Sequence, residues 1–155
     1  MDERAAARLG PPDLELAGFR LWVHGYQFPE LADAWDGNWL RVTAHCEASG
    51  SSVWASGALL DTVSILAFGR GLAALHATLR GEAVLGSHEP NVVVRAAATD
   101  RTGHIAVRVE LTPDHLTQEH AVEFEADQSY LPAVVAQCGA LLERYPVRDA
   151  AGRGV

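Results

Sequence analysis

Apolar and polar residues alternate along several stretches of the chain, the pattern of strands that bury one face. The clearest stretch is 104–111, and 40–47, 92–98 and 119–127 follow the same period. The stretch 14–24 also alternates, but its apolar positions change phase at Ala17-Gly18, which predicts a bulge or kink within one strand. With shorter apolar runs at 53–57 and 83–85, the pattern predicts six or seven strands.

Two stretches instead repeat apolar residues every three or four positions, the spacing of an amphipathic helix. The first follows Asp61 and Thr62, either of which can cap a helix, and the second carries Pro132 in its first turn. Gly69 and Gly71 each weaken the first helix by about 1 kcal/mol relative to alanine. The helix is therefore expected either to pack closely at these glycines or to bend there.

Strands joined mainly by hairpins, with only two helices, predict the α+β class. We expect one curved antiparallel sheet of six to seven strands with both helices packed on it. A length of 155 residues suits one domain, placed at 13–148 between a flexible prefix, 1–12, and a disordered tail, 149–155. The residues expected to be nearly fully buried are Ile65, Leu72, Leu75, Val107, Val109, Leu111, Val122, Phe124, Val134, Cys138 and Leu141.

Charge gives the best functional clue in the residues themselves. The chain has 20 acidic and 12 basic residues, a net charge of −8, and six of the acids fall between Glu110 and Asp127, where there is no arginine or lysine. A hairpin centred near His115 and Leu116 places Arg108 opposite Glu123 and leaves the other carboxylates unpaired. An acidic surface favours basic partners and repels nucleic acid. We predict a surface for a basic protein partner, without direct nucleic-acid binding, at Glu110, Glu119, Glu123, Glu125 and Asp127.

The stretch from His24 to Leu40, with the strand that leads into it, is rich in aromatic residues. It contains six of the chain's eleven aromatic residues (four Trp, three Tyr, four Phe). Such a loop either folds its rings onto the core or offers them to a partner, and the pattern leaves both readings open. The candidate contact residues in it are Tyr26, Trp35 and Trp39.

Other chemistry has weaker support in the sequence. The seven histidines lack metal-ligand spacing and no serine lies in a nucleophile elbow, so no metal, cofactor or catalytic residue is predicted. Cys46 and Cys138 are expected to be buried free thiols. The start of the chain lacks a secretory signal and no apolar run reaches the roughly 18 residues of a membrane span, so we expect a cytoplasmic protein that does not bind membranes.

The alternative to a partner-binding protein is a small-ligand or hydrolytic domain on the concave side of the sheet. It requires histidine and carboxylate side chains to converge in a deep pocket. The candidate histidines for it are His24, His45, His88 and His104.

A series of landmarks follows in order along the chain: Gly25-Tyr26-Gln27-Phe28-Pro29, Asn38-Trp39-Leu40, a strand with Trp54, Glu89-Pro90-Asn91, and Tyr145-Pro146-Val147-Arg148. This order resembles the WapI-type immunity protein family of small bacterial proteins, over most of residues 14 to 148. The first helix departs from it, with His76 and two glycines where a more acidic, tryptophan-bearing helix is expected. The resemblance implies a non-catalytic protein that binds a toxin domain in a fixed stoichiometry.

Overall fold

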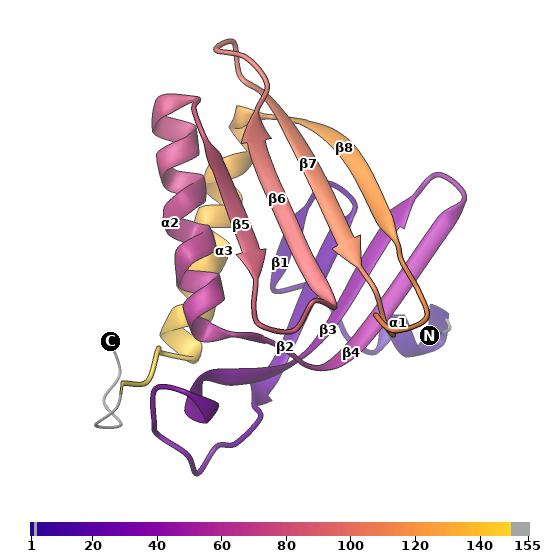
Figure 1. The fold of residues 1–155 in the computed structure, drawn as a ribbon, viewed down its shortest axis with the longest axis vertical. Coiled ribbons are helices and arrows are strands. Elements are labelled where there is room, and N and C mark those ends of the chain that lie inside the picture. The colour runs from indigo at the N-terminus through magenta and orange to yellow at the C-terminus, as the bar shows by residue number, and fades with distance from the viewer. Residues whose placement is uncertain (2, 150–155) are drawn as a thin grey trace.

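The computed structural model describes residue 1 and residues 3–149, which form two antiparallel sheets of four strands and three α-helices (Figure 1). Each sheet is a meander in which strands adjacent in sequence pair with one another. The first sheet contains β1 (Leu14–Leu16), β2 (Phe19–Tyr26), β3 (Trp39–Ala48) and β4 (Ser51–Asp61). The second contains β5 (Glu82–Gly86), β6 (Val92–Ala98), β7 (His104–Leu111) and β8 (Ala121–Asp127).

The helices are α1 (Glu3–Ala7), α2 (Thr62–Thr78) and α3 (Leu131–Arg144). Helices α2 and α3 pack side by side along one side of the two sheets (Figure 1). The predicted cap of α2 is confirmed, because the Asp61 side chain accepts a hydrogen bond from the Ser64 amide at 2.7 Å. Within the described part of the chain, no helix is both long and apolar enough to cross a bilayer.

The α+β class is confirmed, but the single curved sheet of six to seven strands is wrong. After β4 the chain enters α2, which carries it away from the edge of the first sheet and returns it as β5, the edge of a second sheet. The strands of the two sheets cross, with one sheet in front of the other (Figure 1). Their apolar faces share one core with α2 and α3. Alternation marks the buried face of a strand equally well in either arrangement.

The predicted strand over 14–24 is also wrong, because Ala17-Gly18 is a hairpin turn and not a bulge. Leu16 pairs with Phe19, and Ala17 adopts a left-handed backbone with φ 52°. A two-residue turn between paired strands changes the phase of alternation just as a bulge does. Gly18 is required here because a Cβ atom would lie 2.1 Å from the Glu47 carbonyl oxygen on β3.

The predicted core is confirmed at nine positions, each at most 2% exposed: Ile65, Leu72, Leu75, Val107, Val109, Leu111, Val134, Cys138 and Leu141. It is wrong at Val122 and Phe124, which are only half-buried. Both lie on β8, an edge strand with a neighbour on one side only. Cys46 and Cys138 are buried and free, and burial raises the pKa of the Cys138 thiol to about 11. Their slow reaction with thiol reagents stays a prediction.

The two glycines of α2 lie where the helix comes closest to its neighbours. A Cβ atom on Gly71 would be 2.9 Å from the Ala83 Cβ on β5, and one on Gly69 would be 3.0 Å from the Cys138 Cβ on α3. The helix is continuous from Thr62 to Thr78. Of the two readings, close packing is therefore confirmed.

Candidate partner-binding surface

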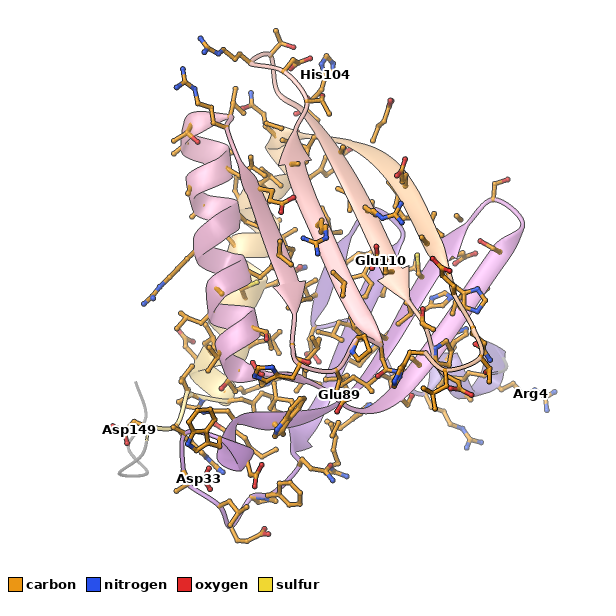
Figure 2. All side chains as sticks on the ribbon, viewed as in Figure 1. Arg4, Asp33, Glu89, His104, Glu110 and Asp149 are labelled. Atoms are coloured by element: carbon orange, nitrogen blue, oxygen red, sulfur yellow. The ribbon has the colours of Figure 1, made fainter. Side chains whose placement is uncertain are left out.

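The acidic residues of β8 lie on the outward face of the second sheet. Pairing with β7 sets Glu123 opposite Arg108, Glu125 opposite Ala106 and Asp127 opposite His104. These three carboxylate side chains are exposed and alternate along the strand, so they share one face. In Figure 2, Glu110 lies on the sheet face turned to the viewer and His104 lies at the far end of that sheet.

Arg108 lies between two of the predicted acids. Its Nη1 donates to Glu123 Oε1 at 3.0 Å, as the hairpin register predicted, and its Nε donates to Glu110 Oε1, also at 3.0 Å. The second contact was missed because it joins residues two apart on one strand, and the sequence alone does not tell toward which neighbour a long side chain turns. The Glu123 side chain is exposed and those of Arg108 and Glu110 are partly exposed, so the pairs orient the carboxylates and add little stability.

Three predicted acids have no ion pair within the described chain: Glu119, Glu125 and Asp127. Glu119 lies in the exposed loop before β8 and not on the strand itself. The amide of Ser129 donates to Asp127 Oδ1 at 2.8 Å, and this hydrogen bond lowers the pKa of the Asp127 carboxyl. The acidic row Glu123, Glu125 and Asp127 therefore keeps unbalanced negative charge at neutral pH.

A shallow hollow of about 480 Å³ lies beside this row on the same face. Ala97 and Ala106 are paired across β6 and β7, and their small side chains form its floor. Charged side chains surround that floor: Glu82, Arg95, Arg108, Glu123 and Glu125. A partner side chain can approach the sheet closely here while charged groups line its path.

The aromatic loop lies at the other end of the molecule. Figure 2 places Asp33, within the loop, and Asp149 together at one end, far from His104 at the other. The structure therefore does not bring Tyr26, Trp35 and Trp39 together with the β8 acids. The predicted site residues form two separate groups.

Most of the aromatic loop is fixed to residues 146–148, which follow α3. The Tyr26 hydroxyl donates to the Pro146 carbonyl at 2.5 Å, and the Arg148 guanidinium covers the Tyr26 ring. The same guanidinium donates to the loop carbonyls of Phe28, Pro29, Leu31 and Gly37. Trp39 is half-buried, whereas Trp35 is 80% exposed. Of the three aromatic candidates, only Trp35 is freely presented to solvent.

Asn38 is the second anchor of the loop, and no sequence argument pointed to it. It is 2% exposed, and its Oδ1 accepts from the Arg148 amide at 2.7 Å and from Thr62 Oγ1 at 2.6 Å. Its Nδ2 donates to the carbonyls of Ala34 and Arg148. The only signal was its place in the Asn38-Trp39-Leu40 landmark.

The candidate histidines lie in separate surroundings. His24 shares a hydrogen bond with Thr43, and His45 shares one with Ser52, each 2.8 Å long. His88 is exposed in the loop after β5. His104 does meet a carboxylate, with its Nδ1 2.5 Å from Asp100 Oδ2, but this pair lies on an exposed turn and not in a deep pocket. The described histidines thus do not form the convergent pocket that the small-ligand alternative requires.

A stack of rings on the outer face of the first sheet was also missed. The Trp54 ring lies 3.8 Å from the His45 ring and 5.8 Å from the Trp22 ring, measured between centroids. His45 is 4% exposed, and its buried Nδ1 has no hydrogen-bond partner within the described chain. Burial lowers the pKa of His45.

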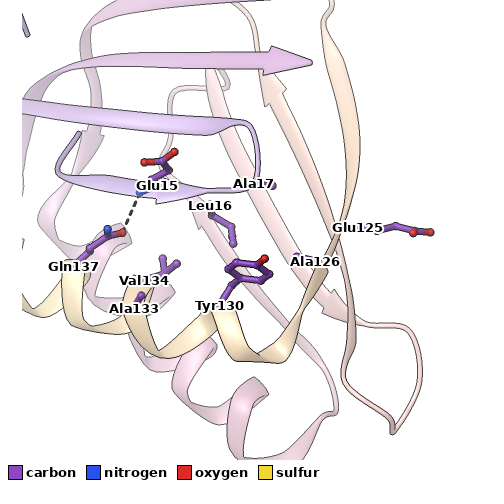
Figure 3. Close-up of a pocket in the computed structure, with 9 residues that line it drawn as sticks. All are labelled: Glu15, Leu16, Ala17, Glu125, Ala126, Tyr130, Ala133, Val134 and Gln137. Atoms are coloured by element: carbon purple, nitrogen blue, oxygen red, sulfur yellow. Dashed lines mark hydrogen bonds between the residues drawn. The ribbon is translucent and has the colours of Figure 1, made fainter. Parts of the chain in front are cut away.

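A second hollow, of about 490 Å³, lies between β1, β8 and α3 (Figure 3). Leu16, Ala126 and Val134 give it apolar walls, and the Tyr130 ring projects into it (Figure 3). Glu15 and Glu125 also line it, from the two sheets. In Figure 3 the Glu125 side chain points away from the hollow, whose interior is mainly apolar.

The fold and surface together define an α+β protein built from two packed antiparallel meanders, with a row of carboxylates on an exposed edge strand. The family model described as "Immunity protein WapI-like family" matches residues 13–146, and the chain belongs to this family. The resemblance inferred from the order of landmarks is thereby confirmed. Neither the curated proteins nor the solved structures contain a significant match to the chain.

Proposed function

We propose that this protein is a cytoplasmic immunity protein that neutralises a basic, nuclease-type toxin domain by binding it, without chemistry of its own. The observation that carries the proposal is the exposed row Glu123, Glu125 and Asp127 on β8, in which, within the described chain, the one ion pair joins Glu123 to Arg108. Membership of the immunity protein family supports the toxin as the kind of partner.

Charge complementarity explains how such a protein inhibits a nuclease. A nuclease needs a basic surface to bind its RNA or DNA substrate. An acidic protein that covers this surface excludes the substrate, and the long-range attraction between opposite charges speeds their association.

The contacts of each acid suggest its role in binding. Glu110 and Glu123 are oriented by Arg108 before any partner arrives, so little side-chain freedom is lost on binding. Glu119, Glu125 and Asp127 supply the unpaired charge, and the alanine-floored hollow accepts a partner side chain. In the aromatic loop, Trp35 is the contact residue of a second patch, which Tyr26 and Trp39 hold in shape.

The test measures the affinity of this chain for a basic nuclease-type toxin domain, sought among the products of neighbouring coding regions, together with protection from that toxin. The variant Glu123→Arg/Glu125→Arg is expected to weaken binding at least about tenfold and to abolish protection, with an unchanged melting temperature. Raising the salt concentration from about 50 to 500 mM should slow association of the wild type.

A matched control separates local contact from overall charge. Glu89→Arg/Glu143→Arg changes the net charge by the same amount at exposed positions outside the row. It is expected to bind within about twofold of the wild type. Equal loss in both double variants, or no loss in either, removes the β8 row from the interface and leaves Trp35 as the candidate contact.

A further inference from the structure

The strand that carries the acidic row also has a free backbone edge. Strand β8 is the last of its sheet and, among the described residues, pairs only with β7. Backbone bonds at the two ends of this hairpin define its pattern. The Leu111 amide donates to the His120 carbonyl at 3.3 Å, and the Gln128 amide donates to the Gly103 carbonyl at 2.9 Å.

These two bonds decide which groups of β8 are free. In an antiparallel pair, every second residue directs its N–H and C=O groups to the neighbouring strand. The residues between them direct these groups to the opposite side. Both bonds involve even-numbered residues that directly flank β8, His120 and Gln128. The same alternation therefore directs the backbone groups of Val122, Phe124 and Ala126 to β7. The N–H and C=O groups of Glu123 and Glu125 therefore point away from β7, toward the open edge.

Two different surfaces flank this edge. On the outward side are the exposed carboxylates of Glu123 and Glu125. On the inward side is the hollow of about 490 Å³ walled by Leu16, Ala126 and Val134 (Figure 3). A strand added to β8 would direct alternate side chains to these two sides.

We propose that the open edge of β8 accepts an extended segment of the partner as a fifth strand, in which basic and apolar residues alternate. The basic residues lie opposite Glu123 and Glu125, and the intervening apolar side chains enter the hollow beside Leu16 and Val134. The backbone bonds contribute affinity, and the two kinds of side chain contribute specificity. This inference rests on the proposed function only for naming the partner as a toxin domain.

Charge also excludes a second copy of this chain as the added strand. Antiparallel pairing of two β8 strands through their free groups would set glutamates directly opposite glutamates, and like charges in that position destabilise a sheet. The same repulsion keeps an exposed edge from pairing with itself. A strand with basic residues at these positions would instead be attracted to Glu123 and Glu125.

A peptide experiment tests the edge without any toxin. One blocked eight-residue peptide alternates arginine and valine, and a control peptide has four arginines followed by four valines. Amide exchange of the isotope-labelled protein is followed by NMR. The alternating peptide should slow exchange at Glu123 and Glu125 at least about tenfold, and the control peptide should not. No protection at these amides, or equal protection by both peptides, overturns the inference.

A matched pair of variants tests the backbone directly. Glu125→Pro and Glu125→Ala both remove the carboxylate, but only proline removes the outward N–H, and an edge strand tolerates proline at such a position. With unchanged melting temperatures, the proline variant should bind the alternating peptide, and the toxin domain of the proposed function, at least about tenfold more weakly than the alanine variant. Equal binding by the two overturns the added strand and leaves the proposed function standing, whereas a toxin domain that the wild type does not bind overturns the function alone.

Discussion

The guanidinium carbon of Arg148 lies 3.6 Å from the centre of the Tyr26 ring, although the two residues are separated by most of the chain. This contact joins the end of the described chain to the start of the aromatic loop. The loop has almost no regular structure apart from the 3₁₀ turn Asp36–Asn38. Its shape therefore depends on the few side chains that bind its carbonyl groups.

The first prediction concerns this anchor. Arg148→Met keeps the apolar stem but removes the donors to four loop carbonyls, and should lower the free energy of unfolding by about 1–3 kcal/mol. Urea denaturation followed by tryptophan fluorescence measures the change. Arg101→Met, at an exposed turn, is the control and should change stability by less than about 0.5 kcal/mol. Equal midpoints for Arg148→Met and the wild type would contradict the anchoring role.

The second prediction compares glycines in the two long helices. A Cβ on Gly71 would clash with Ala83 at 2.9 Å, whereas one on Gly139 meets no atom within 4 Å. Gly71→Ala should therefore destabilise the protein by about 1–3 kcal/mol despite its better helix propensity. Gly139→Ala should stabilise it by about 0.5–1 kcal/mol. Calorimetric melting of both variants checks the pair, and a gain from both would mean that α2 does not pack closely on β5.

The third prediction concerns the core of the second sheet. Val107 on β7 is 1% exposed, while Val122 on the edge strand β8 is only half-buried. Val107→Ala should cost about 2 kcal/mol through lost methyl contacts and the cavity left behind, and Val122→Ala should cost less. Denaturant titration of both variants provides the comparison. A larger loss at Val122 would be incompatible with β8 at the edge.

The fourth prediction concerns pH. Burial lowers the pKa of His45, so the unfolded chain binds a proton at this histidine more readily than the native protein does. Stability from this group is fully present above the ordinary histidine pKa of about 6.5 and is lost as pH falls below it toward the native pKa. His45→Gln should flatten that fall in melting temperature. If the pH profile of this variant is unchanged, the fall in melting temperature at acidic pH is due to other groups.

His104 should show the opposite dependence, which provides an internal check. The hydrogen bond that His104 Nδ1 donates to the Asp100 carboxylate raises the pKa of His104, so its stabilising contribution is present below about pH 6.5 and is lost as pH rises through the native value. Asp100→Asn should remove this dependence and leave the part of the profile that depends on His45 unchanged. NMR titration of the two histidines measures both shifts directly.

Local patterns were enough to predict several features of this protein. The Arg108–Glu123 pair follows from alternation on two consecutive strands and a short connection, because these determine the register of a hairpin. The cap at Asp61 and the stripe of Ile65, Leu72 and Leu75 follow from the helical period in the same way. Each of these depends on residues close together in the sequence.

Long-range features could not be predicted in this way. The phase change at Ala17-Gly18 is the same for a bulge and for a hairpin turn, and only pairing of Leu16 with Phe19 distinguishes them. The partner of Arg148 could not be read from its neighbours, because the residues it contacts are more than one hundred positions away. The Trp22–Trp54 stack likewise depends on strands that are not adjacent in the sheet.

The sequence by itself determined the α+β class, the position of the two long helices α2 and α3, the buried face of most strands and the row of carboxylates, because each is a periodic property of contiguous residues; the short helix α1 in the prefix was not predicted. Only the tertiary structure decided that the strands form two crossed sheets, that β8 is an edge and that the aromatic loop lies far from the acids. Periodicity specifies which side of an element avoids water. Which other element covers that side depends on how the whole chain closes around one core.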